Sequence, residues 1–159
     1  MHALCALAAG CLLLAACSRT HTVTTADGKV SYQAKGKDAG TMTVTGKNGE
    51  TATLNFNGGK VPDDYPKDVP VYTGAKVVMS QSASDKHAHS LMLESEDSAD
   101  KIAAFYQKGL EANGWKTEST VNAAQLTMVN ATKEQRQMTL QITDAGAKRS
   151  IMQVVADKP

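Results

Sequence analysis

Aromatic side chains are scarce in this sequence, and neither sign of charge dominates it. Phe, Trp and Tyr make up 4% of the 159 residues, which argues against a stacking platform for bases or sugars. Lys and Arg number 17 against 16 Asp and Glu, so the net charge is close to zero. The chain therefore has neither the basic stripe typical of nucleic-acid binding nor the polybasic patch that attracts anionic lipid.

Cysteine is confined to the start of the chain, as Cys5, Cys11 and Cys17. The remainder can form no disulfide and offers no thiol as a nucleophile. It also contains no Gly-x-Ser-x-Gly elbow, no glycine-rich phosphate loop and no His-Glu-x-x-His motif. These absences predict that the protein is not an enzyme and has no resident cofactor.

One long apolar run is present, at residues 3–16, and no charged side chain precedes Arg19. The run is shorter than the helix of about 20 residues that spans a bilayer, and it is typical of a secretory signal peptide. Only Met1 and His2 precede it, so the usual basic amino-terminal region is missing. The alternative is a buried apolar helix, but a polar, Thr-rich segment comes directly after the run.

The segment Leu14-Ala15-Ala16-Cys17 resembles the lipobox of bacterial lipoproteins. The resemblance implies cleavage before Cys17 and acylation of that residue, and several acyl chains give stable membrane attachment where one chain is reversible. Cys11 is a competing site, but Ala8-Ala9-Gly10 before it lacks the leucine. Ser18, in place of Asp, resembles the pattern of outer-membrane lipoproteins that face the periplasm.

Composition divides the chain into a signal at 1–16, an acylated Cys and tether at 17–22, a β-meander at 23–59, a Pro-rich strap at 60–73 and a larger domain at 74–159. In the meander, Asp27-Gly28 and Asn48-Gly49 are hairpin turn signals, and the second predicts a type I′ turn. Apolar residues alternate with Thr and Asn around that turn. A ribbon this small is marginal alone, and we expect it to pack on the later part of the chain.

The strap carries three of the four prolines, Pro62, Pro66 and Pro70, which favour a stiff, extended segment. Together with Gly74-Ala75-Lys76-Val77, residues 62–72 resemble the opening of a module in uncharacterised bacterial lipoproteins. In that module a later helix carries an aromatic pair and a Gly-Trp, which are Phe105-Tyr106 and Gly114-Trp115 here. The resemblance spans residues 60–120 and implies no particular activity.

The domain at 74–159 is predicted to be α+β, with the element order ββαββββ and one main helix on one face of an antiparallel sheet. Strands are expected around residues 77–79, 90–94, 115–119, 126–129, 138–142 and 151–155, because apolar residues alternate there. A helix is expected at 98–113, because apolar residues recur at intervals of three and four.

Gly114 comes directly after the predicted helix, at the position of a left-handed cap residue. This places Trp115 against Leu110, the hydrophobic contact of a Schellman ending. Trp115 is therefore interpreted as a core anchor rather than as a platform for a ligand.

A cluster of possible metal ligands lies at Asp85, His87 and His89. In an extended segment His87 and His89 project from the same face, and two imidazoles with a carboxylate could hold a transition-metal ion in a weak, open site. An exposed polar hairpin explains the same residues and is the favoured interpretation.

We therefore expect a non-enzymatic lipoprotein of the cell envelope, anchored through Cys17. Its expected role is contact with another envelope protein, through the Thr-rich sheet face or the strap, and it has no nucleic-acid partner. The alternative is a periplasmic metal-binding lipoprotein that uses His87 and His89.

Overall fold

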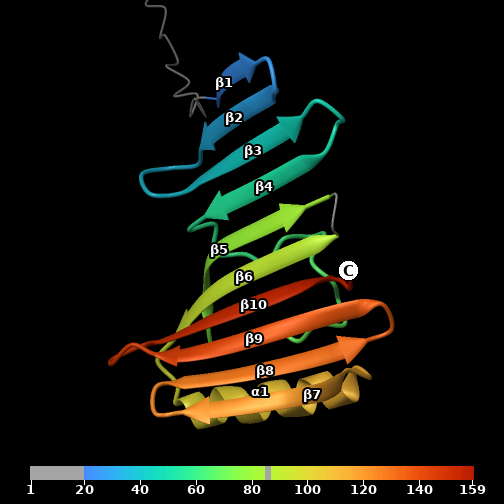
Figure 1. The fold of residues 1–159 in the computed structure, drawn as a ribbon. Coiled ribbons are helices and arrows are strands. Elements are labelled where there is room, and N and C mark those ends of the chain that lie inside the picture. Colours follow the sequence, from blue (N-terminus) through green and yellow to red (C-terminus); the bar gives the residue numbers. More distant parts are fainter. Residues whose placement is uncertain (1–19, 85–86) are drawn as a thin grey trace, which may run out of the picture.

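The structure, a computed structural model, describes residues 20–84 and 87–159. The described chain forms one antiparallel sheet with a helix and the strap behind it (Figure 1). The elements are β1 (Thr20–Thr25), β2 (Gly28–Ala34), β3 (Gly40–Gly46), β4 (Thr51–Phe56), β5 (Lys76–Ala83), β6 (Ala88–Ser95), α1 (Ala99–Ala112), β7 (Lys116–Ala123), β8 (Leu126–Lys133), β9 (Arg136–Asp144) and β10 (Arg149–Asp157). The predicted signal, Cys17 and Asp85 lie outside the described residues.

The predicted α+β class is wrong. The fold is β-rich, with 55% strand and 10% helix, and its ten described strands belong to one sheet. The strands of the predicted meander extend this sheet, because β4 pairs with β5 in the register Leu54↔Gln81. Edge-to-edge pairing satisfies the backbone groups of both edges, so the meander joins the domain without burying its apolar face.

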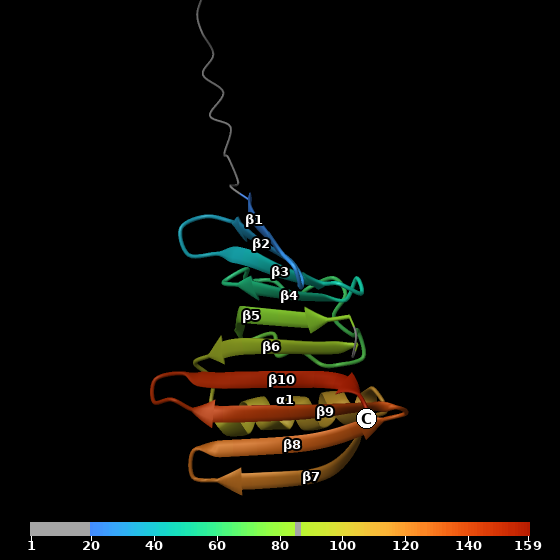
Figure 2. The same cartoon turned by 45° about the horizontal axis from the view of Figure 1, so that its top comes forward.

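The strand order is β1-β2-β3-β4-β5-β6-β10-β9-β8-β7. The last strand, β10, lies between β6 and β9 and pairs with both. The helix α1 connects β6 to β7 and carries the chain to the far edge of the sheet. Figure 2 shows one continuous ladder of strands from β1 to β7, with α1 behind its last part.

The core lies between strands β5, β6, β8, β9 and β10 on one side and the layer formed by α1 and the strap on the other. Alternate residues of β6, β9 and β10 are buried on that side, as the predicted alternation requires. Ile102, Tyr106 and Leu110 of α1 close the core from the helix side. The strap contributes Tyr65, Val69 and Tyr72, all of which are buried.

The helix begins and ends where the sequence predicts. The Ser98 hydroxyl accepts a bond from the Lys101 amide at 3.4 Å, which caps the first turn. At the other end Gly114 has φ 75° and its N–H donates to the Glu111 carbonyl, while the Trp115 N–H donates to the Leu110 carbonyl at 2.9 Å. These two bonds define a Schellman motif.

Two local expectations differ from the structure. Gly49 has φ 81° but Asn48 does not have a positive φ, so the second hairpin lacks the type I′ turn, which needs both. The strap is not extended throughout, because the Tyr65 N–H donates to the Pro62 carbonyl and the Val69 N–H to the Pro66 carbonyl. Pro62 and Pro66 therefore each open a turn of four residues.

Candidate functional site

The strap is fixed to the sheet and helix by side chains that pair with its backbone. Trp115 Nε1 donates to the Asp68 carbonyl at 2.9 Å, and Gln153 Nε2 donates to the Pro70 carbonyl at 2.8 Å. The Tyr72 N–H donates to the Tyr106 hydroxyl at 3.3 Å. A buried loop must have its polar groups satisfied, and these bonds do so at successive points. The strap is thus part of the core rather than a free docking segment.

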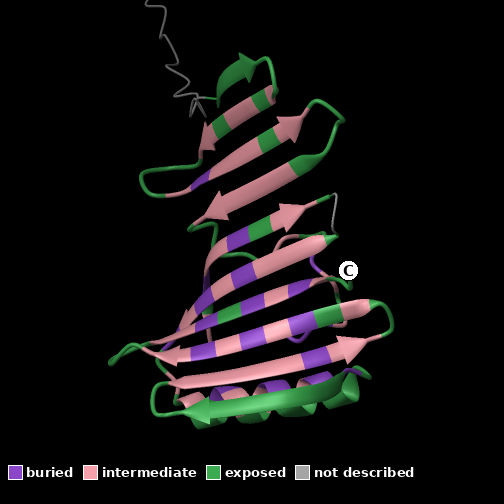
Figure 3. Cartoon of the chain, in the orientation of Figure 1, coloured by how far each residue is buried: buried purple, intermediate pink, exposed green. Residues whose placement is uncertain are grey.

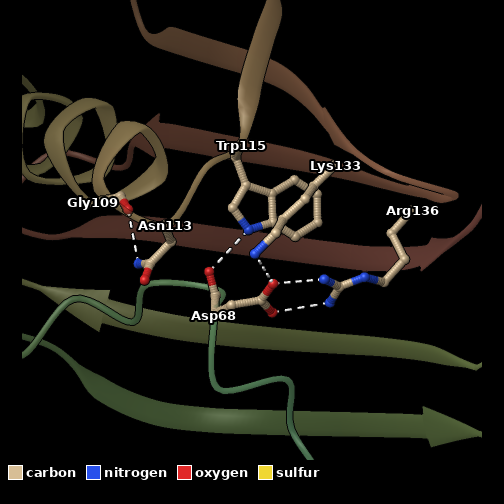
Figure 4. Close-up of polar contacts among 6 residues, drawn as sticks. All are labelled: Asp68, Gly109, Asn113, Trp115, Lys133 and Arg136. Atoms are coloured by element: carbon tan, nitrogen blue, oxygen red, sulfur yellow. Dashed lines mark hydrogen bonds and ion pairs between the residues drawn. The ribbon is translucent and has the colours of Figure 1, made fainter.

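The carboxylate of Asp68 is the centre of a charged cluster (Figure 4). Arg136 donates two hydrogen bonds to it, at 2.9 and 2.6 Å, and Lys133 Nζ donates at 2.7 Å. The three side chains are only 24–27% exposed, so the pairs are poorly screened by water. The Arg136 guanidinium, and after it Lys133, hold the pKa of Asp68 well below its usual range.

Trp115 completes this cluster. The Arg136 guanidinium lies 5.1 Å from the centre of the Trp115 ring, within the range of a cation–π contact. The ring itself is 4% exposed, so it is not open to a ligand. Beside it, Asn113 Nδ2 donates to the Gly109 carbonyl at 2.8 Å and holds the last turn of α1 (Figure 4). The cluster locks the strap to the end of α1 and to the β8–β9 hairpin.

A second ion pair fixes the other end of α1. Tyr72 donates to Asp97 Oδ2 at 2.6 Å, and Lys101 Nζ contacts Asp97 Oδ1 at 2.8 Å. Lys101 and then Tyr72 lower the pKa of Asp97, while the bond to Asp97 raises the pKa of Tyr72. These shifts result from pairing at a helix start and therefore have a structural explanation.

A hollow of about 560 Å³ lies between the first half of α1 and strands β7, β8 and β9. It exists because the facing side chains are small: α1 presents Ala99 and Ala103, and β7 presents Thr117, Thr120 and Asn122. None of them reaches across the gap, and all of β7 is exposed. Val129 and Ile142 line it from the sheet, and Asp100 and Asp144 are its charged lining groups.

Each of the two predicted histidine ligands lies near a carboxylate from another part of the chain. His87 has φ 40°, so the segment is not extended at that point, and its Nδ1 lies 2.8 Å from Asp157 Oδ2. His89 is in β6, with its Nδ1 3.9 Å from Asp64 Oδ2 and its ring edge-on to Tyr65. In residues 20–84 and 87–159, no three His, Cys, Asp or Glu side chains gather as a metal site would require. The metal site stays a prediction.

Sequence reasoning missed Asp68 and the hollow. The partners of Asp68, Lys133 and Arg136, lie more than sixty positions along the chain, and no local pattern joins them. A signal was present, since Asp68 comes directly before the apolar Val69-Pro70 of the strap, and a charge held against apolar residues needs a partner. The hollow had a weaker signal, the small side chains Ala99 and Ala103 on the apolar stripe of the helix.

Comparison with known proteins gives one match. A family model described as START domain-like matches residues 76–150, which run from β5 to the start of β10 and include α1 and the hollow. The match covers under half of the chain and marks a similarity over these elements. Neither curated proteins nor solved structures gave a match. In the part of the chain that the structure describes, no helix has the length and apolar character of a membrane span.

Proposed function

We propose that the protein is a non-enzymatic binding module of the cell envelope, held at a membrane by lipid on Cys17. The lipobox-like segment at residues 14–17 and the apolar run before it support the anchor. β1 begins at Thr20, directly after the proposed anchor, so the first edge of the sheet would lie close to the membrane. The residue after Cys17 is Ser18, which supports the periplasmic face of the outer membrane by resemblance.

The observation that supports binding is the hollow between α1 and β7. Its volume of about 560 Å³ falls within the roughly 300–1,000 Å³ of small-molecule sites. The apolar part of its sheet side is formed by Leu126, Val129 and Ile142. Gln107, Asn122 and Asp100 add hydrogen-bonding groups. Its lining includes two carboxylates and no Lys or Arg, so it suits a small neutral or cationic ligand with an apolar body.

A substitution that fills the hollow tests this binding function. Ala103→Phe should place a ring in the space, and Ala112→Phe is the matched control, because Ala112 is on the exposed end of the same helix. The probe is neutral N-phenyl-1-naphthylamine, added to unacylated Cys17→Ser protein so that no detergent competes for it. We expect saturable fluorescence enhancement, weakened at least tenfold by Ala103→Phe alone. Enhancement that is absent, or equal in both variants, would contradict the proposal.

The anchor has its own test. Cys17→Ser should move the protein from the membrane fraction to the soluble fraction and abolish labelling by a palmitate analogue. Cys11→Ser is the matched control and should change neither. If Cys11→Ser releases the protein and Cys17→Ser does not, the lipid is on Cys11 and the proposed anchor at Cys17 is wrong. Contact with another envelope protein stays a prediction that in-cell crosslinking of the acylated chain can address.

A further inference from the structure

The face of the sheet opposite α1 and the strap, here called the open face, carries a row of apolar side chains that crosses most of the sheet, with polar residues such as Asn130 and Thr139 beside it on β8 and β9. Residues directly opposite in a paired register share a face. The registers therefore place one row across this face, formed by Phe56, Met79, Met92, Met152, Met128 and Val121, with Gln141 between the last two methionines. Alternation puts these residues opposite the buried core positions.

The exposed large apolar side chains also lie on the open face. Five large apolar side chains are exposed in the described chain, namely Val23, Tyr32, Val44, Val121 and Met152. Each one is on the open face, as the pairings Val23↔Val30, Val30↔Val44 and Tyr32↔Met42 show for the first strands. Figure 3 shows β1 and β7 exposed along their whole length, whereas buried and less buried residues alternate along β6, β9 and β10. Exposed apolar patches of this extent are typical of interaction sites.

We propose that the open faces of two copies of this chain pack against each other as a two-layered sandwich. Strands spaced 4.8 Å apart give the sheet a width of roughly 40 Å, and strand length adds roughly 20 Å in the other direction. The face thus offers roughly 800 Å² per copy, the area that each partner gives to a stable interface. Two antiparallel sheets with such faces pack about 10 Å apart with strands nearly aligned.

The chemistry of the face favours a second copy over other occupants. The row itself contains no Asp, Glu, Lys or Arg, and Lys76 and Glu94, which share the open face, lie directly opposite each other at one end of β5 and β6. Two rows can therefore meet without a like charge in either. Methionine is flexible and fills irregular gaps, which suits a surface that faces its own counterpart. A lipid-facing surface would instead carry the Trp, Lys and Arg of membrane interfaces, and this row has none of them.

The position of the chain start is compatible with this arrangement. A two-fold axis that runs across the strands puts β1 of one copy next to β1 of its partner. Both chain starts then lie at the same end of the dimer, where two anchors can enter one membrane. The dimer does not depend on the hollow, which lies on the other side of the sheet, so the two proposals can fail separately.

Photo-crosslinking of the full acylated chain in its own membrane tests the dimer. Two copies with different epitope tags are co-expressed, and benzoylphenylalanine replaces Met152, which is 40% exposed in the centre of the open face. Ala112, exposed on the helix side, is the control position. We expect a light-dependent product that contains both tags from position 152 and none from position 112. A product with lipid or with another protein alone, or no product at all, would overturn the proposal.

A charged residue introduced on the open face should weaken the dimer. Met152→Lys should reduce the crosslink from a probe at Val121 at least tenfold, and Val121→Lys should do the same to a probe at Met152. Val121 is 52% exposed on an edge strand, so a lysine there should leave the fold of one chain intact. Ala112→Lys adds the same charge behind the sheet and should leave the crosslink unchanged. Crosslinks that both open-face lysines leave unchanged would show that this face is not the interface.

Discussion

Gly114 shows how one backbone angle ends the helix. Its φ is 75°, a value that residues with a Cβ adopt at a cost. A Cβ there would come no closer than 4.0 Å to Lys133 Cε, so space is not the constraint. We therefore expect Gly114→Ala to lower the free energy of unfolding by about 1 kcal/mol through the backbone alone. Urea denaturation measures the loss.

Gly58 provides the matched control for that substitution. No atom lies within 4 Å of a Cβ built there, and it does not have the left-handed φ of Gly114. Gly58→Ala should change stability by no more than a few tenths of a kcal/mol. If Gly114→Ala has no larger effect than this control, the Schellman ending contributes nothing to stability.

The free energy of unfolding should depend on pH through Asp68. Its folded pKa is depressed by Arg136 and Lys133, so its contribution is fully present above the unfolded pKa of about 3.9 and is lost as the pH falls through the folded pKa. Asp68→Asn should lower the free energy of unfolding at pH 7 by about 2 kcal/mol, because two cations lose their partner. The difference from the natural protein should narrow as the pH falls below about 4.

Unfolding by urea at a series of pH values measures this effect. Asp27→Asn is the control, because Asp27 pairs with Lys47 at 3.1 Å but the two side chains are 91% and 63% exposed. A pair so open to water contributes under about 1 kcal/mol. Two results would contradict this prediction. One is an equal loss of unfolding free energy in the two variants, and the other is a loss for Asp68→Asn that stays the same below a pH of about 4.

At the scale of elements, the contact between α1 and the strap depends on Gly109. A Cβ on this residue would lie 2.8 Å from Pro70 Cβ and 3.1 Å from Pro70 Cγ. Alanine in a helix normally gains about 1 kcal/mol over glycine. Here we expect the clash to dominate, so that Gly109→Ala lowers stability by about 1–3 kcal/mol.

A double-mutant cycle isolates this clash. Pro70→Gly should relieve it, so Gly109→Ala should cost much less in the Pro70→Gly background than alone. The measurement is again the free energy of unfolding of the four proteins. If Gly109→Ala stabilises the natural protein, the helix and the strap are not in the tight contact described.

The elements themselves could be predicted closely from the sequence. The expected helix at 98–113 is observed as Ala99–Ala112, because Ser98 and Gly114 mark its ends chemically. Strands appear at each expected segment, because alternation is a local property of the chain. The strap differs, since three prolines restrict φ but do not decide whether the chain turns between them.

At the scale of the molecule, the sheet is packed on both α1 and the strap only in its last part. Each of the six residues of β1 is exposed, whereas β6, β9 and β10 carry much of the buried core. We therefore expect amides of β1 to exchange with solvent orders of magnitude faster than amides of β9 and β10, which open only with the whole fold. Hydrogen exchange monitored by mass spectrometry measures this. Equal protection at both ends would contradict it.

The sequence alone determined the local elements, the helix ends and the apolar face of the meander, because caps, turns and alternation act between neighbouring residues. Only the tertiary structure decided that β4 pairs with β5, that β10 lies between β6 and β9, and that Asp68 meets Lys133 and Arg136. Strand pairing uses backbone groups that almost every residue carries, so alternation says which face is apolar but not which edges meet. For the same reason the sequence showed an apolar face, and only the sheet order showed that no helix of the described chain covers it.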